Sequence, residues 1–308
     1  YEIQYCDWSS DVCSSDLYIN AVAGRATAAA RQNGYNHHAP AQAEGRSAEP
    51  DMDNETILIQ ETQKKGLSLN ALKYIAIAAM LIDHVAIAFL DDSTALFHIL
   101  DAIGRTTAPI MVFAAVEGYH HTKDLKKYLT RLFVFALISY LPFMYLFTNT
   151  FRPLRLNVIF TIFFGLVAVH AAHTIRNVFL KIVVILSLMI LTVPMDNGGD
   201  CVPMMLMFDF FYGNRKNQLA GYLLIVLLGS GISDYLLAPF WSLFYLGFFD
   251  VEAFIYGEYD SLGYLIPFAL LLFYNGERGK RDPFSKWVFY IFYPAHLTVI
   301  ALIRIFLT

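Results

Sequence analysis

The fold is decided by an apolar stretch at residues 68–90, which reads SLNALKYIAIAAMLIDHVAIAFL. A helix of this length extends for roughly 34 Å at 1.5 Å per residue, which is enough to cross the hydrocarbon core of a bilayer. The stretch also holds Lys73, Asp83 and His84. An ionisable side chain in lipid is costly unless it is paired or hydrated, so these three residues are candidates for function.

The composition places the chain in a membrane. Of its 308 residues, 57% are hydrophobic and only 16% are charged, and the mean hydropathy is +0.48. An ordinary soluble domain is less apolar than this. The 22 Lys and Arg against 26 Asp and Glu give a net charge of −4, which excludes a basic nucleic-acid-binding protein. Three cysteines without a C-x-x-C pair indicate neither a disulfide framework nor a zinc ribbon.

Similar apolar stretches recur along the chain. The clear ones are at residues 68–90, 95–119, 128–148, 156–173, 177–194, 217–232 and 284–307, and weaker candidates are at 202–212, 235–249 and 262–274. Only helices and closed barrels satisfy their backbone groups in lipid, and these stretches lack the alternation of a barrel strand. The sequence therefore predicts an all-α, polytopic transmembrane helical bundle of about eight to ten membrane helices.

The first 51 residues do not resemble the rest of the chain. They are polar, show no apolar periodicity, and contain at residues 6–17 the string CDWSSDVCSSDL, which resembles a translated sequencing adapter. A segment of this kind is set aside in reasoning about a fold. We expect residues 1–51 to be non-native, with a disordered tail as the alternative. The native domain would then be residues 52–308, starting at Met52.

Positive charges in short loops predict the orientation of the helices. They occur before or after alternate apolar stretches, at Lys64, Lys65, Lys123, Lys126, Lys127, Arg131, Arg176, Lys181, Arg215 and Lys216. This pattern predicts a multi-pass protein of the inner membrane with a cytoplasmic N-terminus. Arg152 and Arg155 do not follow it. The basic stretch at residues 276–281 follows it only if a weak candidate near 235–249 is re-entrant or interfacial.

Lys73 and His84 share one face of the first predicted helix. Eleven residues at about 100° each bring the two side chains within roughly 20° of each other, about 16 Å apart along the axis. We interpret this face as the lining of a shared cavity, with Lys73 toward the cytoplasm. The simpler alternative is that His84 is a packed, satisfied residue and that Asp83 forms a structural ion pair with Arg105.

Further polar residues follow in the second predicted helix. Asp101 and Arg105 have the i, i+4 spacing of a simple ion pair. Glu117 precedes a basic run at residues 123–131. That run is either a positive-inside anchor or a cradle for the phosphates of an anionic cofactor, and both can hold.

Two histidines stand side by side at His120 and His121. Adjacent residues on a helix point about 100° apart and no third ligand is evident, so we expect no metal site. Elsewhere, Asn157 could hydrogen-bond across helices. Pro294 removes a backbone hydrogen bond in the last apolar stretch, so that His296 would lie in a polar patch of the bundle.

A set of short motifs runs in order through residues 67–308. They are Leu72-Lys73-Tyr74-Ile75-Ala76, Met80-Leu81-Ile82-Asp83-His84, Gly104-Arg105, Glu117-Gly118-Tyr119, Lys127-Tyr128-Leu129, Arg131-Leu132, Asn157, Tyr274-Asn275-Gly276 and Tyr293-Pro294-Ala295-His296-Leu297. Together they resemble the TraX family of conjugal-transfer membrane proteins, which is implicated in acetylation of the pilin N-terminus. That family is in turn similar to the integral-membrane acyltransferases, in which a first-helix Arg precedes a functional His by eleven residues. This chain has Lys73 at that position, a point charge instead of a bidentate fork.

The resemblance implies a membrane acyltransferase that moves an acetyl group from acetyl-CoA to an amine or hydroxyl of a pilin-like peptide or a surface glycan. The catalytic residues would be Asp83, His84, Tyr293 and His296. The residues that bind the acyl donor would be Lys73, Arg105, Glu117, Lys123, Lys127, Arg131 and Asn157. Membrane lipid would be a further partner. The alternatives are a proton-coupled transporter or flippase that uses these residues as a proton relay, and a non-catalytic pilin assembly factor.

Overall fold

The computed structural model describes residues 65–148, 155–229, 259–279 and 283–307, together with positions 232, 236, 237 and 243. The chain divides into two compact units, one of Tyr1–Lys65 with His121–Lys123 and one of Gly66–His120 with Asp124–Thr308. Apart from His121, the last residue of α5, the helices below belong to the second unit. The segment at residues 1–51 that we expect to be non-native lies outside the described residues.

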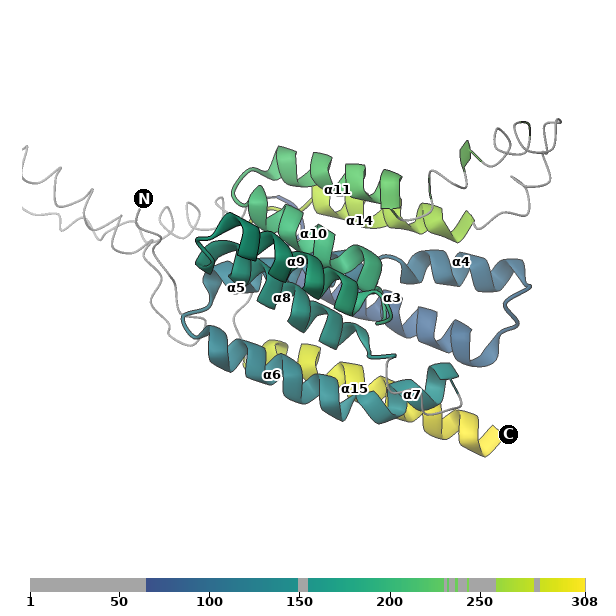
Figure 1. The fold of residues 1–308 in the computed structure, drawn as a ribbon. Coiled ribbons are helices and arrows are strands. Elements are labelled where there is room, and N and C mark those ends of the chain that lie inside the picture. The colour runs from purple at the N-terminus through teal and green to yellow at the C-terminus, as the bar shows by residue number, and fades with distance from the viewer. Residues whose placement is uncertain are drawn as a thin grey trace, which may run out of the picture. The chain divides into compact units, whose positions relative to one another are not determined.

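Helices make up the described part of the chain (Figure 1). In order they are α3 (Leu69–Phe89), α4 (Ala95–Gly104), α5 (Thr107–His121), α6 (Leu125–Ile138), α7 (Tyr140–Thr148), α8 (Val158–Thr174), α9 (Val178–Thr192), α10 (Gly198–Phe210), α11 (Arg215–Gly229), the 3-10 helix η1 (Tyr259–Tyr264), α14 (Leu265–Leu272) and α15 (Pro283–Leu307). The all-α fold expected from the sequence is confirmed.

Polar side chains fix where two of the expected membrane helices begin. The Ser68 hydroxyl accepts a hydrogen bond from the Ala71 N–H at the start of α3 (3.2 Å). The Asn157 carbonyl oxygen accepts one from the Ile159 N–H at the start of α8 (3.1 Å). Such caps satisfy backbone donors that the helix itself leaves open. Both helices therefore begin within two residues of the positions that the apolar pattern predicts.

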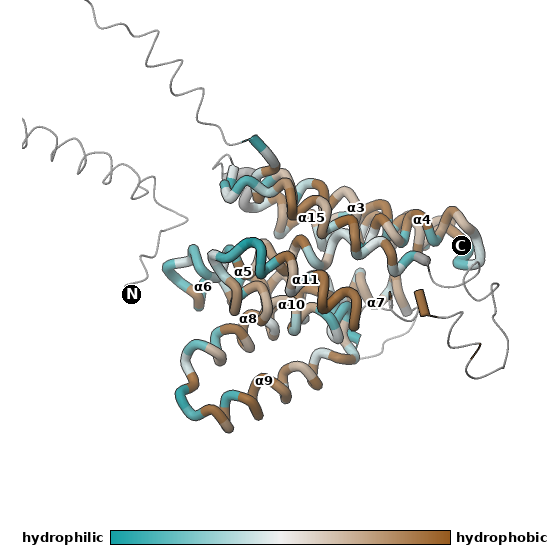
Figure 2. The backbone as a smooth tube through the Cα atoms, turned by 90° about the horizontal axis from the view of Figure 1, so that it is seen from above, coloured by the Kyte–Doolittle hydropathy of each residue, from teal (hydrophilic) through white to brown (hydrophobic). Residues whose placement is uncertain are grey.

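Several helices have the length and composition of membrane spans. Among the described residues these are Leu69–Phe89, Ala95–His121, in which α4 and α5 count together as one span, and Trp287–Leu307. A fourth is added if Leu125–Ile138 and Tyr140–Phe147 form one span bent by 45°. Shorter apolar helices cover Val158–Thr174, Val178–Thr192 and Asp260–Leu272. Figure 2 shows apolar residues along the helices and hydrophilic ones in turns such as that between α8 and α9. The protein is a polytopic membrane protein, with three or four of the eight to ten expected crossings supported by length and composition.

Two of the expected spans are interrupted where a proline removes a backbone donor. The stretch expected at 95–119 turns at Arg105 and Thr106 between α4 and α5, and the stretch expected at 128–148 turns at Ser139 between α6 and α7. Pro109 and Pro142 follow these turns. Proline has no N–H to donate to the carbonyl four residues earlier, here residues 105 and 138, so each helix ends there.

The N-terminal end of α3 is tied to the segment that follows α14. Leu67 pairs with Tyr274 in an isolated bridge, and the Leu69 N–H donates to the Glu277 carbonyl oxygen (2.8 Å). The loop that continues into the basic stretch at 276–281 therefore lies at the same end of the bundle as the start of α3. The expected re-entrant or interfacial segment at 235–249 falls almost wholly outside the described residues.

The packing of α3 positions the candidate site. This helix lies against α4 and α15, while α15 also contacts α6 and α7. A second group is formed by α8, which packs against α6, α9 and α10, and by α10, which packs against α11. The views in Figures 1 and 2 show both groups as neighbouring helices. Each group contains buried histidine or acidic side chains that could take part in catalysis or binding.

Candidate functional site

Two buried histidines connect α3 with α15. His84 is 5% exposed and His296 is 7% exposed. Their rings are parallel within 3°, with 4.9 Å between centroids, and His84 Nδ1 lies 2.7 Å from His296 Nε2. The structure thus brings together two of the residues predicted to be catalytic.

A backbone carbonyl fixes the protons of this pair. His296 Nδ1 lies 2.7 Å from the Phe292 carbonyl oxygen, and a carbonyl only accepts, so His296 Nδ1–H donates. In the neutral His296 ring, Nε2 is then an acceptor, and the proton shared with His84 belongs to His84 Nδ1. His84 Nε2 consequently bears a lone pair, which is what a general base requires.

Aromatic rings hold the two imidazoles in place. Tyr293, which is 3% exposed, meets His84 and His296 edge to face, with 6.3 and 5.6 Å between centroids. Phe147 of α7 meets His84 in the same way at 5.4 Å. These contacts leave the His84 ring little freedom to turn. The predicted residue Tyr293 therefore lies beside the histidine pair.

Asp83 lies close to His84 but faces α4. Its Oδ2 is 3.9 Å from His84 Nε2, which is longer than a hydrogen bond. A Cβ at Gly104 would overlap the Asp83 carboxylate. Glycine at position 104 is therefore what allows α4 to approach α3 at this point.

Arg105 pairs with one carboxylate that the sequence predicts and with one that it does not. Its Nη2 lies 2.8 Å from Asp101 Oδ2, the i, i+4 partner, and 2.8 Å from Asp260 Oδ2 of η1. The Asp101 pair was predicted. The sequence also indicates Asp83 as an alternative partner of Arg105. Among the described residues the second partner is Asp260, because η1 packs against α4 and supplies a second acceptor for the guanidinium.

Lys73 faces α15 as well, about 16 Å from His84 along the helix axis. Its Nζ lies 5.1 Å from the centroid of the Phe289 ring. The charged side chains of Arg278 and Glu117 interact electrostatically with its ammonium group. Lys73 and His84 thus share a face of α3, as their spacing predicts. The structure does not bring the two side chains into contact.

The residues predicted to bind the acyl donor are divided between two levels of the bundle. Lys73 and Glu117 lie toward one end, and Lys127 and Arg131 lie in α6. Lys123 belongs to the other compact unit. Arg105 precedes α5, whose 15 residues extend for about 22 Å, so it lies at the level of Asp83 instead.

Asn157 is fully buried and is used within the fold. Its Nδ2 donates to the Ala136 carbonyl oxygen of α6 (2.9 Å), and its Oδ1 caps α8. The interhelical hydrogen bond is the one that the sequence predicts. Because both ends of the amide are engaged, a role for Asn157 in binding an acyl donor receives no support from its contacts.

The basic residues of α6 have different surroundings. The Arg131 guanidinium lies 6.0 Å from the ring centroids of Tyr128 and Tyr290. Lys127 is largely exposed and pairs with Asp124 at 3.2 Å. The Lys127 backbone N–H, and then its ammonium, hold the pKa of the Asp124 carboxyl below its usual value. Lys127 is thus available at the surface, whereas Arg131 is packed among aromatic rings.

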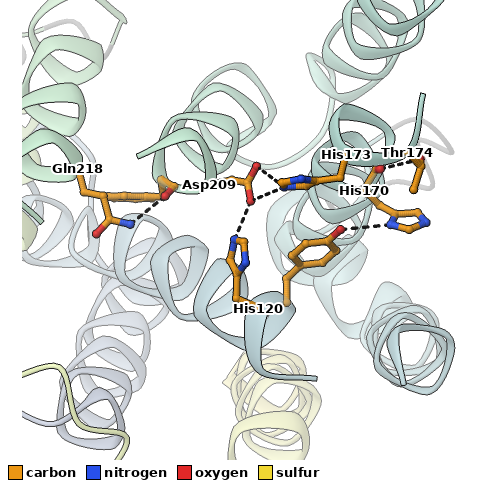
Figure 3. A network of polar contacts seen from close by, with 8 residues as sticks. His120, His170, His173, Thr174, Asp209 and Gln218 are labelled. Atoms are coloured by element: carbon orange, nitrogen blue, oxygen red, sulfur yellow. Dashed lines mark hydrogen bonds and ion pairs between the residues drawn. The ribbon is translucent and has the colours of Figure 1, made fainter. Parts of the chain in front are cut away.

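A second polar cluster joins α5, α8 and α10 (Figure 3). His120 Nε2 lies 2.7 Å from Asp209 Oδ1, and His173 Nε2 lies 2.9 Å from both oxygens of Asp209. Figure 3 shows both imidazoles directed at the one carboxylate. Tyr212 stacks on His120 with 3.6 Å between centroids, and Tyr119 stacks on His173 at 5.9 Å.

Sequence reasoning missed this cluster. It considered His120 with His121 and found no third ligand, but the partners of His120 are His173 and Asp209, which are 53 and 89 residues away. In the structure each of these residues is the penultimate residue of its helix, whereas the predicted apolar stretches end at 119, 173 and 212 and give the three residues no common position. The sequence does not show that those three helix ends converge.

Comparisons with known proteins identify the family of the chain. A family model described as TraX protein matches residues 68–304. The chain belongs to the TraX family. It is also 32% identical over 246 residues to "Probable fimbrial assembly protein FimC, serogroup H1" from Dichelobacter nodosus, in an alignment that covers 77% of this chain and 95% of that protein. No solved structure matches the chain.

The TraX region extends from the first turn of α3 into the last turns of α15. Both the His84–His296 pair and the His120–His173–Asp209 cluster lie inside it. The resemblance to TraX proteins that the motifs indicate is therefore confirmed.

Proposed function

We propose that this TraX protein is a membrane-embedded acyltransferase that moves an acetyl group from acetyl-CoA to an amine or hydroxyl acceptor. The observation that carries the proposal is the His84–His296 pair, in which the Phe292 carbonyl sets the tautomers and leaves a lone pair on His84 Nε2. A base in a defined tautomer is what the proton transfer of this reaction needs.

The reaction can be written on these residues. His84 Nε2 takes the proton of the acceptor amine or hydroxyl as its nitrogen or oxygen forms a bond to the thioester carbonyl carbon. The resulting imidazolium keeps its Nδ1–H bond to His296 and lies near the Asp83 carboxylate, 3.9 Å away. When the C–S bond breaks, His84 Nε2 returns the proton to the leaving thiolate. The steps balance without another reactant.

The acyl donor would enter from the end that carries the basic residues. Lys73, Lys127 and Arg131 offer positive charge to the phosphates of acetyl-CoA. The acyl arm would then reach along the α3–α15 contact over the roughly 16 Å between Lys73 and His84. The distribution of basic loops favours a cytoplasmic location for that end and for the N-terminus, and we place the protein in the inner membrane.

The molecule that would accept the acetyl group is proposed from the name of a related protein. The related FimC protein is named for fimbrial assembly, which favours a pilin-like peptide, and a surface glycan is the other candidate. The same name favours a second function, a non-catalytic factor that holds pilin subunits. The two functions differ in whether acetyl-CoA is consumed.

The test measures transfer from carbon-14-labelled acetyl-CoA in membrane vesicles that contain the full chain. The acceptor probes are a peptide with a free N-terminal amine and the glycan fraction of the same cells. We expect His84→Gln to lower transfer at least 100-fold, the usual contribution of a general base. The matched control is His98→Gln, because His98 lies on α4, 3.9 Å from Asp260 and outside the pair.

Two outcomes would overturn the proposal. Equal transfer by the wild type and the His84→Gln variant would remove His84 as the base. Binding of pilin without any transfer from acetyl-CoA would identify the protein as an assembly factor.

A further inference from the structure

Three helices end at one place, and each presents a potential metal ligand from its penultimate residue. His120 precedes the last residue of α5, His173 that of α8 and Asp209 that of α10. One ligand atom from each residue lies within 4.8 Å of the others. We propose that His120, His173 and Asp209 form a binding site for a divalent transition-metal ion, with Zn²⁺ as the best-fitting ion.

The spacing of the ligand atoms is close to what an ion requires. The distances from the Asp209 oxygens to the two Nε2 atoms are 2.7 to 2.9 Å. Ligands about 2.0–2.1 Å from a tetrahedral Zn²⁺ lie roughly 3.3 Å apart. Each distance between Asp209 and an imidazole nitrogen would therefore lengthen by about half an ångström. Each imidazole would bind as the neutral ring with its proton on Nδ1.

The helix ends favour a cation at this point. The last carbonyl groups of a helix carry partial negative charge, equivalent to about half an elementary charge. Here the C-terminal ends of α5, α8 and α10 all contribute, and the Asp209 carboxylate adds its own charge. A dipositive ion would be attracted by the three helix ends and by the carboxylate together.

The surroundings hold the ligands in place and leave a way in. The Tyr212 ring lies within 17° of parallel to His120, and the Tyr119 ring within 21° of parallel to His173. The Asp209 side chain is 7% exposed and that of His120 is 15% exposed, but that of His173 is 47% exposed. An ion can thus enter from the His173 side, and the ligand orientation is fixed before it does.

The donor set selects the class of ion. Two imidazoles and one carboxylate suit Zn²⁺ and its first-row neighbours, whereas Mg²⁺ and Ca²⁺ prefer oxygen ligands. Three protein ligands leave a coordination position for water or a substrate group, as in catalytic zinc sites. The site lies on other helices than the His84–His296 pair, so it does not depend on the proposed acetyl transfer.

The test is direct metal binding to the full chain in detergent, purified through a tag without histidines. The probes are Zn²⁺, measured by elemental analysis, and Co²⁺, whose visible absorption reports tetrahedral nitrogen and oxygen ligation. We expect one ion per chain, with Zn²⁺ displacing Co²⁺. Asp209→Asn should weaken Co²⁺ binding at least 100-fold.

The matched control is His170→Gln. His170 lies three residues before His173 on α8 and contacts the Tyr119 hydroxyl (3.2 Å), but it is not one of the three ligands, so its replacement should change the affinity by less than twofold. His173→Gln alters an exposed side chain and serves as the ligand variant if Asp209→Asn does not fold. Absence of stoichiometric Zn²⁺ and Co²⁺ from the wild type would overturn the proposal. Equal binding by His170→Gln and the folded ligand variant would do the same.

Discussion

The imidazole of His84 lies parallel to that of His296 and shares a 2.7 Å hydrogen bond with it, although 212 residues separate the two along the chain. His296 is itself anchored to its own helix through the Phe292 carbonyl. The contact therefore joins α3 to α15 and determines which nitrogen of His84 carries a proton. A change at either helix would alter the chemistry available to the other.

Replacing His296 should reveal this dependence. His296→Ala removes the acceptor of the His84 Nδ1–H, and a buried donor without a partner costs about 1–3 kcal/mol. We expect acetyl transfer to fall at least tenfold and the unfolding midpoint in detergent to drop. His296→Gln retains an amide oxygen that can accept, so it should recover part of both losses. If Gln and Ala variants were equally impaired, the acceptor role of His296 would be contradicted.

The close approach of α4 to α3 predicts a second effect. A methyl group at position 104 would overlap the Asp83 carboxylate, and overpacking of this kind typically costs about 1–3 kcal/mol. Gly104→Ala should therefore lower thermal stability and move Asp83 relative to His84. The control is Gly199→Ala, because a Cβ there meets nothing within 4 Å and alanine favours a helix. Equal thermal unfolding midpoints for the two variants would contradict the close contact between Gly104 and the Asp83 side chain.

Local chemistry explains which parts of the fold were predictable. The apolar stretches at 68–90, 156–173 and 177–194 correspond to α3, α8 and α9 within two residues at each end, because apolar length is the dominant signal in lipid. The breaks before Pro109 and Pro142 were missed, since hydropathy does not register the loss of a backbone donor.

The candidate site was predictable where residues share a helix and not where they meet across helices. The common face of Lys73 and His84 follows from their spacing. The second partner of Arg105, Asp260, lies 155 residues away, and the third member of the His120 cluster lies 89 residues away. Such contacts depend on how helices pack, which no local periodicity encodes.

The ion pairs made by Arg105 and by Lys127 should differ sharply in their contribution to stability. Removing one partner of a buried ion pair costs about 3–5 kcal/mol. The Arg105 side chain is 36% exposed, so we expect a smaller loss than for a fully buried pair, about 2–3 kcal/mol, for Arg105→Ala. Lys127→Ala breaks the exposed pair with Asp124 and should cost less than about 1 kcal/mol. Chemical unfolding in detergent measures both, and similar losses would show that Asp101 and Asp260 do not depend on Arg105.

Asn157 and Asn177 cap neighbouring helices but differ in what else they do. Both accept a hydrogen bond from a backbone N–H of the first turn, α8 for Asn157 and α9 for Asn177. Asn157 also donates to the Ala136 carbonyl oxygen, and it is fully buried. Asn177→Ala should therefore cost only the value of a cap, about 1 kcal/mol.

Asn157→Ala should cost more, about 2–4 kcal/mol, because it removes the cap and leaves the buried Ala136 carbonyl without that donor. The measurement is the difference between the two unfolding free energies in the same detergent. If the interhelical bond holds α6 against α8, this difference exceeds about 1 kcal/mol, and acetyl transfer by folded Asn157→Ala stays near the wild-type rate. A large loss of transfer at unchanged stability would instead place Asn157 in the binding of the acyl donor.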